Sequence, residues 1–132
     1  MTLYYLASLL ALKHFVADGP LQLPYQYLNK GKFGHPGGLL HATIHGVFTF
    51  GALAIVAPSL WWLAVADAVA HYFIDLVKTR MTKREWAERA QTLNGTPCLA
   101  IYSDWYFYAL VLGQALHFLC YGFILAYVAG LS

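Results

Sequence analysis

Four long apolar stretches make up most of this chain and limit its fold more than any other feature. They cover residues 3–17, 39–57, 60–77 and 105–131. A membrane-spanning helix needs about 20 consecutive apolar residues, so four such helices with short connections use up the 132 residues of the chain. Only 11% of the residues are charged, compared with about a quarter in soluble domains. The sequence therefore predicts an all-α integral membrane four-helix bundle, with residues 1–132 forming one domain.

The basic residues gather at alternate connections between these stretches. They are Lys13, Lys30 and Lys32 in or beside the first connection, and Lys78, Arg80, Lys83, Arg84 and Arg89 in or beside the third. Because basic loops stay on the cytoplasmic side, this distribution predicts a multi-pass protein of the cytoplasmic membrane with both termini outside. A lipid bilayer is then its first partner, and the charges form no stripe typical of nucleic-acid binding.

Both basic connections carry signals for short helices that lie on the membrane surface. Pro24 suits the first position of such a helix in the first connection. In the third connection, Thr82 and Glu85 form a capping box and Asn94-Gly95 supplies a stop. This second pattern predicts a separate amphipathic helix between the third and fourth stretches.

Polar side chains recur inside the apolar stretches at a spacing of three or four residues. They are His14 and Asp18 in the first stretch, His41 and His45 in the second, Asp67, His71 and Asp75 in the third, and Gln114 and His117 in the fourth. Residues four apart lie on one face of a helix, and an ionisable group inside the hydrocarbon is costly without a partner. At 1.5 Å per residue, His45, His71 and His117 lie about 10 Å below the cytoplasmic boundary, with Asp67 at least a turn deeper. The four helices are therefore expected to bring polar groups to one layer.

Inward-facing histidines and carboxylates on facing helices of a bundle are typical of a metal site. Their chemistry suits a divalent transition metal such as Zn, Mn or Fe. The predicted ligands are His45, His71, Asp75 and His117, with His14, Asp18 and His41 as further ligands or a second site. Asp18 and Asp67 are also the candidate catalytic residues, because a site with enough other ligands leaves these carboxylates free for proton transfer.

Each polar group also has a purely structural interpretation. His14 and Asp18 would form a hydrogen bond at a helix end, His41 and His45 would bond backbone carbonyls, Asp75 would pair with Lys78 or Arg80, Gln114 would join two helices, and His35 would be an ordinary loop residue. The common depth of several pairs favours a metal site over these separate explanations.

The order of the motifs resembles a family of uncharacterised small integral membrane proteins of bacteria and phages. The motifs are HFVADGPLQ, KGKFGHPGGLLHATIHG, ADAVAHYFID and GQALH, and they extend over nearly the whole chain. The family's last motif usually reads Asp-Gln-x-x-His, whereas Gly113 precedes Gln114 here. The resemblance implies a protein of the bacterial inner membrane in which the fourth helix contributes His117, and it implies no reaction.

The predicted site favours a metal-dependent hydrolase acting on a lipid-like or amphiphilic substrate at the cytoplasmic leaflet, with a metal-bound water as the attacking group. Membrane di-iron hydroxylases use more histidines in several clusters, which makes an oxygenase a weaker alternative. A b-type haem protein with two axial histidines is another alternative, although the aspartates disfavour it. A non-enzymatic bacterial or phage partner protein with a structural metal is the third. The sequence leaves open the metal, the substrate and whether the chain forms a homo-oligomer.

Overall fold

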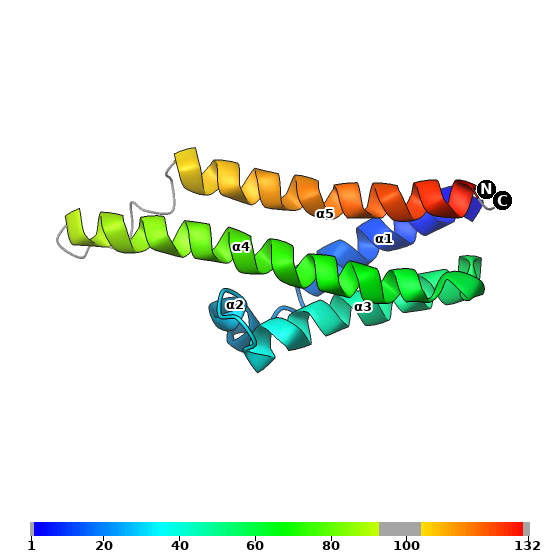
Figure 1. The fold of residues 1–132 in the computed structure, drawn as a ribbon, viewed down its shortest axis with the longest axis horizontal. Helices are drawn as coiled ribbons and strands as arrows, with labels where there is room; N and C mark the ends of the chain where they lie inside the picture. Colours follow the sequence, from blue (N-terminus) through cyan, green and yellow to red (C-terminus); the bar gives the residue numbers. More distant parts are fainter. Residues whose placement is uncertain (1, 93–103, 131–132) are drawn as a thin grey trace.

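Four long helices and two short ones account for most of residues 2–92 and 104–130, the parts of the chain that the computed structural model describes (Figure 1). The elements are α1 (Thr2–Asp18), α2 (Pro24–Asn29), α3 (Pro36–Val56), the 3-10 helix η1 (Pro58–Leu60), α4 (Trp62–Thr92) and α5 (Asp104–Gly130). Side chains are described for residues 2–82 and 107–130. These regions contain no strand, so the predicted all-α fold class is confirmed.

The four long helices enclose a common interior. Helix α1 packs against α3 and α5, and α4 packs against the same two helices. Helix α2 packs on α3. The start of α1 and the end of α5 lie at one end of the bundle, and α2 lies towards the other end (Figure 1).

The connection between α1 and α3 folds back onto the bundle. Pro24 is the first residue of α2, as predicted. His35, expected to be an ordinary loop residue, caps α3 instead, because its Nδ1 accepts a hydrogen bond of 3.0 Å from the backbone N–H of Gly37. Gly34 has a φ of +71°, a left-handed conformation that glycine adopts without strain, and its N–H donates to the Tyr72 hydroxyl at 2.7 Å. The turn before α3 is thereby attached to α4.

Helix α4 is longer than the sequence predicts. The expected span ended at residue 77 and a separate helix was to begin at Thr82, but α4 continues without a break to Thr92. No Gly or Pro interrupts residues 62–92, so nothing in the local sequence ends the helix. The Thr82 hydroxyl bonds the carbonyls of Lys78 at 3.0 Å and Thr79 at 3.1 Å, which leaves it unable to cap a new helix. The predicted stop at Asn94-Gly95 lies outside the described residues.

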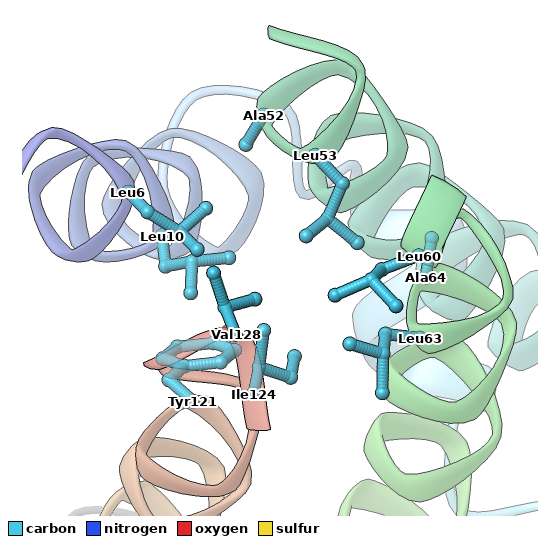
Figure 2. Packing of buried hydrophobic residues seen from close by; sticks show 10 residues of the cluster. All are labelled: Leu6, Leu10, Ala52, Leu53, Leu60, Leu63, Ala64, Tyr121, Ile124 and Val128. Atoms are coloured by element: carbon cyan, nitrogen blue, oxygen red, sulfur yellow. The ribbon is translucent and has the colours of Figure 1, made fainter. Parts of the chain in front are cut away.

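Apolar side chains fill the half of the bundle nearest the termini (Figure 2). They are Leu6 and Leu10 of α1, Ala52 and Leu53 of α3, Leu60 of η1, Leu63 and Ala64 of α4, and Tyr121, Ile124 and Val128 of α5. This core fixes the positions of all four long helices. The halves of these helices beyond it carry the buried polar residues.

The outer surface is apolar and the interior is partly polar. Phe15, Ile55 and Phe123 are 68%, 77% and 75% exposed, whereas five histidines, Asp67, Asp75, Lys13 and Lys30 are buried. Charged side chains are seldom buried in soluble domains unless they are paired, and both buried lysines are paired with aspartates. Helix α3 and residues Phe107–Gly130 of α5 are long and apolar enough to cross a membrane.

Candidate metal centre

Five histidines from four helices meet in one buried layer. His14 comes from α1, His41 and His45 from α3, His71 from α4 and His117 from α5, and all five are buried. The His71 ring stacks between two others, with centroids 3.5 Å from His45 and 4.0 Å from His117. The structure therefore brings these three residues together in one layer.

The first group of candidate ligands combines Asp18 with three histidines. Its ligand atoms belong to Asp18, His41, His45 and His71 and lie within 4.8 Å of one another. Oδ1 of Asp18 is 3.0 Å from Nε2 of His41 and 3.3 Å from Nε2 of His45. The Nε2 atoms of His41 and His71 are 3.3 Å apart. Two ligand atoms each about 2.0–2.1 Å from a tetrahedral zinc ion are about 3.3 Å apart, so these atoms have the spacing of a ligand set.

The second group contains His71, Asp75 and His117. The two oxygens of Asp75 lie 3.6 Å from Nε2 of His71 and 3.6 Å from Nε2 of His117. The same carboxylate is 3.2 Å from Nε2 of His41, a residue of the first group. Because His71 belongs to both groups, the layer has the ligands for a dinuclear centre or for one metal with carboxylates around it.

Two nitrogen atoms of the ligand groups lack a hydrogen-bond partner among the described residues. Nε2 of His45 and Nε2 of His117 are buried and have no hydrogen-bond partner there. Buried polar atoms are rarely left in this state. Nδ1 of His41, His45 and His71 also has no partner within the described chain. The His45 and His71 rings stack on each other, and the His41 ring packs edge-on against both. A metal bound at the Nε2 side would satisfy the first two atoms.

His14 stands beside the ligand groups, although the sequence suggested it as a further ligand. Its Nδ1 is 2.9 Å from the hydroxyl of Tyr121, and its Nε2 is 2.5 Å from Oε1 of Gln114. Nε2 also lies 3.3 Å from Oδ2 of Asp18. These contacts suit a residue that orients Asp18, and Gln114 joins two helices as its structural interpretation predicted.

Asp67 precedes His71 by one turn of α4 and is bound to partners other than those of the histidine layer. Its Oδ2 is 2.6 Å from Nζ of Lys13 and accepts a hydrogen bond of 2.6 Å from the Thr49 hydroxyl. Lys13 was counted among the cations in or beside the first connection, but its side chain is buried inside the bundle, with the residue only 4% exposed. Lys13 shares a buried helix face with Leu10 and Ala17. Of the two candidate catalytic carboxylates, Asp18 is therefore the one at the histidine layer.

Two lysines contact Asp75 at the edge of the layer. Nζ of Lys30 is 3.0 Å from Oδ2, and Nζ of Lys78 is 2.6 Å from Oδ1. The Asp75–Lys78 pair was one of the structural alternatives, whereas Arg80 donates to the carbonyl of Gly31 at 3.1 Å. Lys30 was assigned to a loop from the sequence, but it is buried.

Sequence reasoning missed the polar residues that surround the ligands. Tyr121 follows His117 by one helical turn, so the spacing rule that found the histidines could also have found it. Lys13 follows Leu10 by three residues in the same buried stripe. Gln22 ends the motif HFVADGPLQ but lies outside the helical spacing pattern. Its Nε2 lies 3.2 Å from Nε2 of His41, and the turn after α1 brings it there.

Comparison of the chain with protein families finds a match to one family. The model of a family described as "Protein of unknown function (DUF3307)" matches residues 6–131. The chain belongs to this family. No curated protein and no solved structure matches the chain. In this DUF3307 member, the matched residues reach all four long helices. They include every residue of the two ligand groups.

Proposed function

We propose that this protein is a membrane-embedded metalloenzyme that hydrolyses an ester, amide or phosphoester bond of a lipid-like or amphiphilic substrate. The observation that carries the proposal is the pair of buried ligand groups that share His71. Buried polar groups are normally paired, so each one in the interior needs a partner. Helix packing alone does not require five histidines and two aspartates in one layer.

The exposed apolar surface supports a location in the membrane. The bundle buries its charged groups and exposes large apolar side chains on all four long helices, among them Phe15, Val47, Phe73 and Phe123. Such a surface suits lipid, which imposes no penalty on exposed apolar groups.

The remaining loop cations support an orientation. Lys13 and Lys30 are buried in ion pairs, so they do not count as topological signals. Lys32 and Arg80 are exposed near the α2 end of the bundle, and Lys83, Arg84 and Arg89 follow in the sequence. The positive-inside rule then assigns this end to the cytoplasm and the termini to the outside of the bacterial inner membrane. The histidine layer lies in the cytoplasmic half of such a bundle.

In this proposal the residues of the layer divide into metal ligands and one proton acceptor. His41, His45, His71, His117 and Asp75 would hold one or two Zn, Mn or Fe ions. A bound metal supplies a water whose pKa is lowered towards about 7 and polarises the oxygen of the scissile group. Asp18 is the member whose side chain is partly exposed, at 19%. It suits the role of a carboxylate that meets incoming water and accepts its proton, with His14 orienting it.

The geometry disfavours haem. A b-type haem needs an apolar slot between two axial histidines, whereas the three central imidazoles stack directly on one another, with centroids 3.5 and 4.0 Å apart. The Asp75 carboxylate contacts the same layer, and a carboxylate against the edge of a macrocycle would be unfavourable.

The proposal is tested by the metal content of protein purified in detergent without chelator. We expect bound Zn, Mn or Fe in the wild type and its loss in His71→Gln, because His71 serves both ligand groups. His35→Asn is the matched control: it removes a histidine outside the layer and keeps a residue that caps helices well. Equal metal content in wild type, H71Q and H35N would show that the layer is not the metal site.

Catalysis is tested on the metal-loaded protein in lipid nanodiscs. A panel of lipid esters, amides and phosphoesters is offered, and hydrolysis of one class is expected. It should disappear on chelation and in H71Q, and persist in H35N. If fully metal-loaded wild-type protein hydrolyses none of these classes, the metal is structural and the proposed hydrolase activity is refuted.

A further inference from the structure

We propose that Lys30 and Lys78 form an anion site beside the metal ligands and that the group they bind is the phosphate of the substrate. This inference rests on the proposed metal centre and narrows its substrate from three bond types to a phosphoester. The two lysines are the cations closest to Asp75 among the described residues.

The two ammonium groups converge on one carboxylate from different elements. Lys30 follows the last residue of α2 and Lys78 lies on α4. They contact opposite oxygens of Asp75, at 3.0 Å for Lys30 and 2.6 Å for Lys78. The same two oxygens face the Nε2 atoms of His71 and His117 at 3.6 Å. A group bound to both lysines would therefore lie next to the second ligand group.

The surrounding chain is shaped to hold these lysines. Gly113 on α5 packs against the stem of Lys78, and a Cβ at this glycine would collide with Cδ of the lysine. The carbonyl of Gly31 accepts a bond of 3.1 Å from Nε of Arg80, which anchors the residue after Lys30 to α4. Gly38 brings α3 against the Lys30 backbone, where an added Cβ would lie 3.2 Å from its Cα. The positions of both cations are thus set by the fold.

Charge balance points to a dianionic ligand. With neutral histidines, the negative charges of Asp18 and Asp75 are cancelled by the positive charges of Lys30 and Lys78 before any metal binds. One divalent metal then leaves two positive charges in excess, and a buried net charge of this size is strongly unfavourable without a counter-ion. A phosphate monoester, with a charge of about −1.5 to −2 at pH 7, restores neutrality, whereas a neutral ester or amide does not.

The lysines pair with Asp75 in the absence of metal, but this pairing alone does not explain two cations beside a bound metal. A cation next to a metal ligand repels the metal, so two of them reduce its affinity unless an anion is shared between metal and lysines. Each ammonium has three N–H donors, and one contact to Asp75 leaves others for phosphate oxygens. Ammonium groups are common binders of phosphate in proteins.

The reaction that follows is the hydrolysis of a phosphoester. His41, His45, His71, His117 and Asp75 would hold the metal, which would activate a water for attack on phosphorus. As the new oxygen–phosphorus bond forms, the bond between phosphorus and the ester oxygen breaks. Asp18 would take one proton from the water and pass it to the departing alkoxide, which leaves as an alcohol. A monoester yields inorganic phosphate and an alcohol, so no further reactant is needed.

Inorganic phosphate is the first probe. It is titrated by calorimetry into Zn- or Mn-loaded protein in detergent, with metal content measured for every sample. We expect Lys78→Met and Lys30→Met to weaken phosphate binding about tenfold or more, the effect of losing one charge-assisted contact. Lys32→Met is the matched control and should bind as wild type does, because Lys32 is exposed and contacts Asn29.

Gly113→Ala provides a second test that keeps the charge. The new Cβ should displace the Lys78 stem and weaken phosphate binding, as K78M does. Because the lysine charge is still present in G113A, a weaker affinity would show that the position of the ammonium group matters. Circular dichroism confirms that each variant is folded, and G113A serves if K78M does not fold.

Two further arms identify the source of the phosphate. Phosphatidic acid in nanodiscs and the soluble monoester glycerol phosphate compete against inorganic phosphate, with phosphatidylcholine as a lipid control. Preference for phosphatidic acid assigns a lipid headgroup, and equal binding of the two monoesters assigns the phosphate group alone; both support the inference.

The negative results distinguish a failure of the anion site from a failure of the metal centre. Metal-loaded protein that binds no phosphate, or that binds it equally in wild type, K30M, K78M and K32M, overturns this inference and leaves the metalloprotein intact. Wild-type protein that binds no metal overturns both.

Discussion

Removing the charge of Lys13 should destabilise the bundle more than any change at an exposed lysine. The Lys13–Asp67 pair has an Nζ–Oδ2 distance of 2.6 Å, and both side chains are 2% exposed. Lys13→Met preserves most of the stem volume but leaves the Asp67 carboxylate with the Thr49 hydroxyl as its described partner. Breaking a buried pair by removing one partner costs about 3–5 kcal/mol, so we expect a loss in this range in the free energy of unfolding.

The double variant distinguishes this ion-pair effect from a packing effect. Asp67→Asn alone leaves the Lys13 ammonium unpaired and should also be strongly destabilising. In the double variant K13M/D67N neither position carries a charge, so no buried ion is left without its partner. The coupling free energy should therefore be about 2–3 kcal/mol in the direction of recovery.

Unfolding is followed by circular dichroism as denaturing detergent is added to the protein in mild micelles. Lys32→Met, a change at an exposed lysine, is the control and should stay within about 0.5 kcal/mol of the wild type. If the losses for K13M and D67N add within about 0.5 kcal/mol in the double variant, the two residues are not coupled as an ion pair. A K13M variant as stable as the control would also contradict a stabilising Lys13–Asp67 pair.

Three further predictions follow from packing, metal binding and topology. Gly46→Ala should lower the melting temperature, because a Cβ there would lie 2.9 Å from Cβ of Ala68, whereas Gly51→Ala on the same helix has no neighbour within 4 Å and should not; equal melting temperatures would contradict this packing. Added Zn, Mn or Fe should raise the melting temperature of metal-depleted wild type and leave that of H71Q unchanged; an equal rise in both would dissociate stability from the proposed site. A cysteine at Lys32, in a background without native cysteines, should be shielded from an impermeant reagent added outside intact cells, and labelling there would reverse the topology.

The helices could be predicted from the sequence to a large extent. Long apolar stretches separated by Gly- and Pro-containing connections mark where α1, α3 and α5 begin and end. The end of α4 was predicted too early because the change from apolar to charged residues at Lys78 was taken as the end of a helix. Helix propensity does not depend on whether a residue faces lipid or water, so the charged residues after Lys78 continue α4.

The ligand layer could be predicted because it follows from helical spacing. His41 and His45 lie one turn apart on the same face, as do His71 and Asp75, and the structure brings them together. The ion pairs around the layer could not be predicted in this way. A lysine near the end of an apolar stretch looks the same in sequence whether it faces the interior, as Lys13 does, or the aqueous side.

Lys30 illustrates the same point for tertiary structure. Its burial depends on α2 folding back against α3 and on the contact of Gly31 with α4. These contacts join residues far apart in the chain, and no local pattern encodes them. The distinction between an exposed loop lysine and a lysine buried against Asp75 thus required the three-dimensional structure.

X-ray absorption spectroscopy of the purified, metal-loaded protein reports which atoms surround the metal. We expect a metal bound by nitrogen and oxygen with the multiple-scattering pattern of several imidazoles, and loss of that pattern in H71Q but not in H35N. A spectrum without imidazole ligands, or one that is the same in H71Q as in the wild type, would contradict this expectation.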